Sequence, residues 1–138
     1  MERAMKFRTM FLALAFTCIG TAALAVEEGQ IWQGAYHYPN APSVQFVFFV
    51  TGATSAQFEG VIVENNTLGN PNAPLLYGNV YGQVNRDGIA FEKTYDGTGG
   101  VSHTLQYTGV LGQGYDRFSG TWTNGTNTGT FEMQLRGQ

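Results

Sequence analysis

Four side chains that can carry chemistry lie close together near the middle of the chain. Lys93 and Tyr95 are two positions apart, and His103 and Tyr107 follow in the next apolar segment. Side chains two or four positions apart in an extended strand point to the same side. A lysine beside aromatic rings can pair with a carboxylate or contact a ring through its charge. These residues therefore predict a site for a small, partly anionic or aromatic ligand.

The loop between the two segments determines whether these side chains meet. A loop of residues 96–102 places Tyr95 opposite His103 and Lys93 opposite Leu105. A loop one residue shorter would turn the apolar side chains of the second segment outward. We therefore expect the four side chains to share one face of a hairpin.

Three more aromatic residues, Tyr36, Tyr38 and Trp122, are predicted at the same end of the sheet. The longer connections belong to this end: Pro39–Ser43, Asn65–Leu76 and the turn at Asn124. The mouths of barrels commonly bind ligands. The predicted ligand site is therefore a mouth formed by Tyr36, Tyr38, Lys93, Tyr95, His103, Tyr107 and Trp122.

A second interpretation needs no ligand at all. Aromatic side chains usually fill the interior of a small barrel. The Lys93 stem would then lie along Phe91 and Tyr107, and its ammonium group would reach water at the rim. A chain of this kind would be an inhibitor or envelope component that binds a protein partner through its loops. Outward residues on two strands could also form a subunit contact: Val61, Val63, Tyr77 and Tyr81.

A third interpretation is a lysine-dependent enzyme. Aromatic neighbours remove water from Lys93, which lowers the pKa of its amine and favours a base or a Schiff-base nucleophile. Glu92 and Glu132 alternate outward, so no carboxylate is expected beside Lys93 on the inner face.

Conventional catalytic and metal-binding motifs are absent from the sequence. There is no Gly-x-Ser-x-Gly elbow, and His37 and His103 each stand alone. We therefore expect no metal and no cofactor. Residues 26–138 carry four basic and nine acidic side chains, which disfavours a nucleic-acid partner. No basic amphipathic helix indicates a membrane surface.

Short segments of alternating apolar residues, separated by Gly, Pro and Asn, must position these side chains. They predict eight strands and no helix. The expected strands are Gln30–Tyr38, Val44–Thr51, Gln57–Glu64, Tyr77–Val84, Ile89–Tyr95, Ser102–Leu111, Arg117–Thr123 and Thr128–Leu135.

Eight strands joined mostly by short turns close most simply as an antiparallel up-and-down barrel, which leaves no free edge. The alternative is a sandwich of two sheets. Glycines that alternate with aromatic residues, as in Phe118-x-Gly120-x-Trp122, favour the barrel because they let a strand bend and give room to rings.

The chain resembles the avidin-like and lipocalin-like (calycin) barrels in architecture. The resemblance rests on Trp32 near the start of the first strand, on glycines next to aromatic residues, and on the late strand Phe118-Ser-Gly-Thr-Trp122. It covers residues 26–138 and implies a ligand cavity at one end of the barrel. The Gly-x-Trp spacing of lipocalins is missed, because Gly29 lies three positions before Trp32, and no biotin-binding pattern matches.

Residues 1–25 have the three parts of a secretory signal peptide. Basic residues from Arg3 to Arg8 precede an apolar run, and Ala23-Leu24-Ala25 is a small-residue cleavage site. The only cysteine, Cys18, lies within this leader, so the mature chain would have no disulfide. We expect one domain, residues 26–138, that is secreted or periplasmic and has no stable membrane insertion after cleavage.

Overall fold

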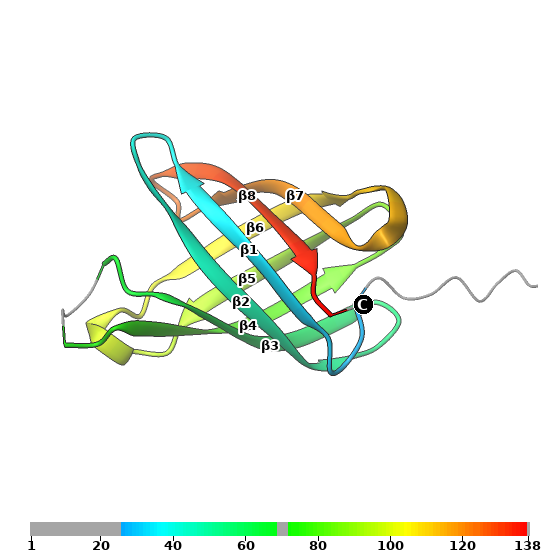
Figure 1. Cartoon of the computed structure of the whole chain (residues 1–138), viewed down its shortest axis with the longest axis horizontal. Coiled ribbons are helices and arrows are strands. Elements are labelled where there is room, and N and C mark those ends of the chain that lie inside the picture. The colour runs from blue at the N-terminus through cyan, green and yellow to red at the C-terminus, as the bar shows by residue number, and fades with distance from the viewer. Residues whose placement is uncertain (1–25, 69–71, 138) are drawn as a thin grey trace, which may run out of the picture.

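The computed structural model describes residues 26–68 and 72–137. The predicted leader, residues 1–25, and part of the predicted long loop, residues 69–71, lie outside this range. Eight strands form one closed antiparallel barrel in chain order (Figure 1). The strands are β1 (Ile31–Tyr38), β2 (Ala41–Ala53), β3 (Gln57–Asn65), β4 (Leu75–Val84), β5 (Gly88–Tyr95), β6 (Thr104–Leu111), β7 (Arg117–Thr123) and β8 (Thr128–Leu135). Two short 3₁₀ turns, η2 (Thr98–Gly100) and η3 (Gln113–Tyr115), lie in connections.

The pairing of β1 with β8 closes the barrel. Trp32 lies opposite Leu135, and the register continues to His37 opposite Thr130. The predicted up-and-down barrel is therefore confirmed, and the two-sheet sandwich is wrong. Each strand lies beside its sequence neighbours because the connections are short hairpins that bring the chain straight back.

The hairpin of β5 and β6 has the predicted register. Lys93 lies opposite Leu105 across β5 and β6, and the backbone N–H of Tyr95 donates to the carbonyl of His103 at 3.1 Å. The β6 strand begins at Thr104, so Ser102 and His103 precede it.

The β2 strand is longer than its apolar run. It begins at Ala41 and contains Pro42, so the predicted turn Pro39–Ser43 shrinks to Pro39 and Asn40. The register with β1 shifts between Tyr36 and Tyr38. This irregularity accommodates a proline that cannot donate to a regular ladder.

Apolar and aromatic side chains fill the barrel interior. Members from every strand are buried, and the largest apolar ones are Trp32, Tyr36, Phe48, Tyr107, Phe118, Trp122 and Phe131. Val26, which precedes β1 in the chain, is fully buried in the same core. At the other end, Leu76 and Val101 are buried close to the connections that follow β3 and β5. The buried side chains of the described residues thus form one hydrophobic core inside the barrel.

Candidate functional site

Lys93 is fully enclosed in the barrel interior. Its exposed fraction is 0%, and that of Glu64 is 2%. The Lys93 ammonium group donates to Glu64 Oε1 at 2.5 Å and to the Tyr95 hydroxyl at 3.1 Å. The predicted rim position of Lys93, with its ammonium in water, is therefore wrong.

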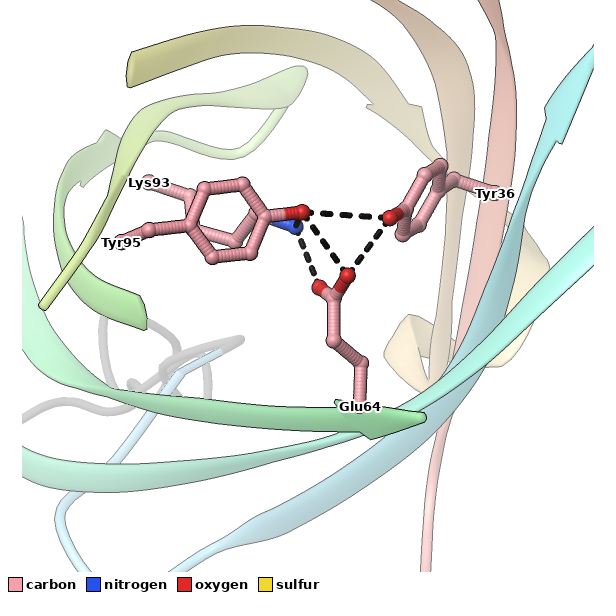
Figure 2. Close-up of polar contacts among 4 residues, drawn as sticks. All are labelled: Tyr36, Glu64, Lys93 and Tyr95. Atoms are coloured by element: carbon pink, nitrogen blue, oxygen red, sulfur yellow. Dashed lines mark hydrogen bonds and ion pairs between the residues drawn. The ribbon is translucent and has the colours of Figure 1, made fainter. Parts of the chain in front are cut away.

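Two tyrosines complete the partners of the Glu64 carboxylate. The Tyr36 and Tyr95 hydroxyls donate to Glu64 Oε2 at 2.6 Å and 2.8 Å, and the two hydroxyl oxygens are 3.2 Å apart. Figure 2 shows Lys93 and Tyr95, both from β5, reaching the carboxylate from one side and Tyr36 from the other. We call Tyr36, Glu64, Lys93 and Tyr95 the Glu64 network.

The sheet register explains how Lys93 reaches Glu64 across an intervening strand. Glu64 lies near the end of β3, Lys93 lies on β5, and β4 runs between them. A Cβ atom at Gly78 on β4 would lie 2.6 Å from the Lys93 Cγ atom. The Lys93 stem therefore crosses β4 at a glycine, where no side chain blocks it.

Burial determines the protonation behaviour of the network. Loss of water lowers the pKa of Lys93, while the negative charge of Glu64 and its hydrogen bond oppose that shift. Burial and the neighbouring Glu64 charge raise the pKa of Tyr36 and Tyr95, so both hydroxyls stay protonated. The Lys93 nitrogen also lies 4.5 Å from the centroids of both tyrosine rings, close enough for cation–π attraction.

Tyr107 lies beside the network without joining it. Its ring stacks on Phe91 with centroids 4.6 Å apart, and its centroid is 5.6 Å from the Lys93 nitrogen. Among the described residues, its buried hydroxyl has no hydrogen-bond partner. A buried, unpaired hydroxyl costs about 1–3 kcal/mol and calls for an explanation.

The structure brings most of the predicted mouth residues together. Tyr38 is half-buried, and its ring centroid lies 5.8 Å from that of Tyr36 and 5.0 Å from that of Trp122. The Trp122 indole N–H donates to the carbonyl of His37 at 3.1 Å. His103 is exposed, with its ring centroid 4.9 Å from that of Tyr95, so it borders the cluster from outside.

One sequence-based statement about polar groups is wrong. A carboxylate does join Lys93 on the inner face, because Glu64 has the same alternation parity as Phe58 and Ile62 on β3. That parity was a signal in the sequence, although an isolated glutamate at a strand end also fits a solvent-exposed position. The His37 ring contacts the Glu132 carboxylate and the Ser43 hydroxyl, two partners that the sequence analysis did not identify.

The ammonium group of Lys93 is already paired, which limits what the interior can bind. A carboxylate ligand would have to displace Glu64 from Lys93 and leave a second buried charge. The described residues contain no group of three His, Cys, Asp or Glu side chains that could hold a metal ion.

A large hollow lies on the outside of the barrel. Its volume is about 990 Å³, and it extends over the outer faces of β1 to β4, β7 and β8. Apolar side chains from three adjacent strands form one wall, which we call the outer patch: Val47, Phe49, Val63, Leu75 and Tyr77. Val47 lies opposite Val63, and Val63 lies opposite Tyr77, so the patch is continuous across the sheet.

Comparison with known proteins supports the fold. The chain is similar to a de novo designed fluorescence-activating β-barrel, with a TM-score of 0.58 and 9% sequence identity, over 81% of this chain and 94% of the designed one. At this identity the likeness shows the fold alone. No family model and no curated protein matches the sequence, so the kinship with calycin barrels stays a prediction. None of the described helical segments is long and apolar enough to cross a membrane.

Proposed function

We propose that this chain is an exported, solid-core barrel that binds a protein partner through the outer patch. One observation carries the proposal. Lys93 is buried among the core side chains and paired with Glu64, whereas the most exposed large apolar side chains of the outer patch line the hollow of about 990 Å³. Phe49 is 39% exposed and Tyr77 is 38% exposed. Neighbouring large apolar side chains that stay exposed mark a surface that a partner can cover.

The hollow also indicates the chemistry of the partner. Next to the outer patch it is lined by amide side chains, including Gln33, the cross-strand partner of Val47, and Gln45. A closed barrel has no free strand edge, so a partner cannot add a strand to the sheet and must be recognised through side chains. We propose a protein segment with apolar side chains against Phe49 and Tyr77, and with polar groups over the glutamines.

Site-specific crosslinking tests this function. A photoreactive phenylalanine analogue replaces Tyr77 in one variant, and Thr121, which is exposed on β7, in the control. We expect one protein from the exported fraction to crosslink at position 77 and not at position 121. The purified partner should then bind the Phe49→Ala variant about tenfold more weakly, which corresponds to about 1.4 kcal/mol.

Two results would overturn this assignment. Equal crosslinking at the two positions, or none at either, would leave the patch without a partner. A crosslinked dimer of the chain would show that the occupant is a second copy and not a different protein.

A second candidate function is binding of a small molecule at the predicted mouth. The unpaired Tyr107 hydroxyl favours it, because a polar ligand atom would satisfy that donor. Native mass spectrometry of protein from its own host should then show a non-covalent adduct that the Tyr107→Phe variant lacks. Spectra without an adduct in the unmodified protein would end this reading.

A further inference from the structure

Three side chains from adjacent strands form a hydrogen-bonded chain on the outer face of the barrel. The Ser43 hydroxyl oxygen lies 2.5 Å from His37 Nδ1. His37 Nε2 lies 2.8 Å and 3.0 Å from the two carboxylate oxygens of Glu132. A nucleophile, a base and a group that orients the base thus lie within hydrogen-bond reach of one another.

A bulge brings Ser43 into this arrangement. Val44 lies opposite Tyr36 and Ala41 lies opposite Tyr38, so two β2 residues, Pro42 and Ser43, face the single residue His37. Bulges of this kind redirect a side chain, and they are over-represented beside active sites. In a regular antiparallel ladder only one β2 residue would lie opposite His37.

The Glu132 carboxylate selects the tautomer of His37 that can act as a base. A carboxylate accepts a hydrogen bond, so it favours the imidazole with its proton on Nε2. Nδ1 then carries a lone pair and accepts the hydrogen bond of the Ser43 hydroxyl. This is the protonation pattern that a general base needs.

The hollow offers a place for a substrate. His37 and Glu132 line it, together with the apolar side chains of the outer patch. We propose that Ser43 is the nucleophile of an acyl-transfer site for small esters, with the apolar acyl group lying against the outer patch. His37 is the general base, and Glu132 is a positioning residue.

The reaction follows from these roles. The Ser43 oxygen forms a bond to the ester carbonyl carbon while its proton passes to His37 Nδ1. The bond from the carbonyl carbon to the leaving oxygen then breaks, and His37 returns the proton to that oxygen, which leaves as an alcohol. The oxygen of a water molecule next forms a bond to the acyl carbon while His37 takes a proton from the water. The bond from that carbon to the Ser43 oxygen then breaks, and His37 gives the proton to the Ser43 oxygen, so the products are a carboxylic acid and free Ser43.

A fluorophosphonate probe tests the nucleophile. Activated serines displace fluoride from such probes, and peptide mass spectrometry locates the label. Ser119 is the control within the same chain, because it is exposed and lines the same hollow, opposite Glu132 across β7 and β8. We expect labelling of Ser43, none of Ser119, and hydrolysis of p-nitrophenyl butyrate that is lost in the Ser43→Ala variant.

Two further variants separate catalysis from structure. His37→Gln should slow labelling of Ser43 about a hundredfold, the contribution typical of a general base. Glu132→Gln should slow it less, and should change the ratio of imidazole tautomers of His37 seen by ¹⁵N NMR. A purely structural role of Glu132 would leave that ratio unchanged.

Labelling of Ser43 compared with Ser119 in the unmodified protein tests the proposal even where a variant fails to fold. Equal labelling of Ser43 and Ser119, or no labelling of either, would overturn it. The outcome does not depend on the protein partner proposed above, because the probe needs only the barrel itself.

Discussion

Lys93 and Glu64 hold opposite charges inside an apolar barrel, so each is tolerated only because the other is present. A buried pair is often replaceable by apolar side chains at little loss, whereas a single uncompensated charge is strongly destabilising. The main effect of the pair is therefore to fix the positions of β3 and β5 on either side of β4. Its net contribution to the free energy of unfolding is small.

This asymmetry gives a first prediction. Glu64→Gln and Lys93→Met, made separately, should each lower the free energy of unfolding by about 3–5 kcal/mol at pH 7. The double variant Glu64→Leu/Lys93→Met should recover more than half of that loss, because it leaves no buried charge. Urea unfolding measures all three. Single variants as stable as the parent chain would show that the pair is not held in the interior.

The buried tyrosines lower the free energy of unfolding at alkaline pH. Burial raises the pKa of Tyr36, Tyr95 and Tyr107 above the ordinary value of 10.0. The unfolded chain loses these protons above about pH 10 and the folded chain keeps them, so the free energy of unfolding falls as pH rises. Each such tyrosine contributes about 1.4 kcal/mol per pH unit. The lowered pKa of Lys93 acts in the opposite direction, but only below the unfolded value of 10.5.

The second prediction isolates one of these tyrosines. Between pH 10.5 and 11.5, Tyr95→Phe should make the decline of stability with pH shallower by about 1.4 kcal/mol per pH unit. Tyr81→Phe is the control, because Tyr81 is 64% exposed on the outer face. Urea titrations at several pH values measure the slopes. Equal changes in the two variants would contradict the role assigned to Tyr95.

Single residues of the candidate site were only partly predictable from the sequence. Alternation placed Lys93, Tyr95 and Tyr107 on the inner face, and the structure confirms it. Alternation does not tell how far a strand continues inside the barrel, so Glu64 could have been the last buried residue or the first exposed one. The pairing across Gly78 depends on strand tilt, which no local pattern specifies.

At the scale of elements, inward glycines let neighbouring strands come close together. Gly109 and Gly120 lie opposite each other on β6 and β7, and the Phe131 ring lies near Gly109. A Cβ atom at Gly120 would lie 2.0 Å from the carbonyl oxygen of Thr108, which is backbone and cannot swing aside. The alternation of glycine and aromatic residues in the sequence predicts this role, and the geometry explains it.

The third prediction tests that close approach. Gly120→Ala should lower the free energy of unfolding by about 3 kcal/mol, since overpacking here must move backbone. Gly52→Ala is the matched control, because its nearest neighbour would be the flexible Glu59 side chain at 3.3 Å. Thermal unfolding followed by circular dichroism measures both. Similar melting temperatures for the two variants would contradict the argument.

Strand number and strand order were predictable because they depend on period-two alternation and on turn residues. Register was predicted for one hairpin, in which the seven-residue loop after Tyr95 places Lys93 opposite Leu105. The start of β2 was not predictable, because Pro42 normally ends a strand and here lies in a bulge. The same bulge places Ser43 against His37, which no pattern in the sequence indicates.

At the scale of the whole molecule, the β1–β8 pair makes this a closed barrel and brings the first and last strands together. Figure 1 shows the end of β8 beside the start of β1, and Trp32 lies opposite Leu135. The backbone N–H of Arg136 also donates to the carbonyl of Ile31 at 2.8 Å. The contacts of a closed barrel do not depend on which hairpin connection is cut.

The fourth prediction follows from this closure. A circular permutant joins Arg136 to Val26 through a flexible Gly/Ser linker and begins at Gly125, in the exposed turn between β7 and β8. Every strand pair is kept, and exposed turns tolerate new termini. We therefore expect the same far-ultraviolet spectrum, a single cooperative urea transition, and a free energy of unfolding lower by about 1–2 kcal/mol because the β7–β8 loop is open. A matched permutant that begins at Tyr107, within β6, should not fold because its cut breaks a central strand. If both permutants failed, or if both folded equally well, the β1–β8 closure would not be what holds the barrel together.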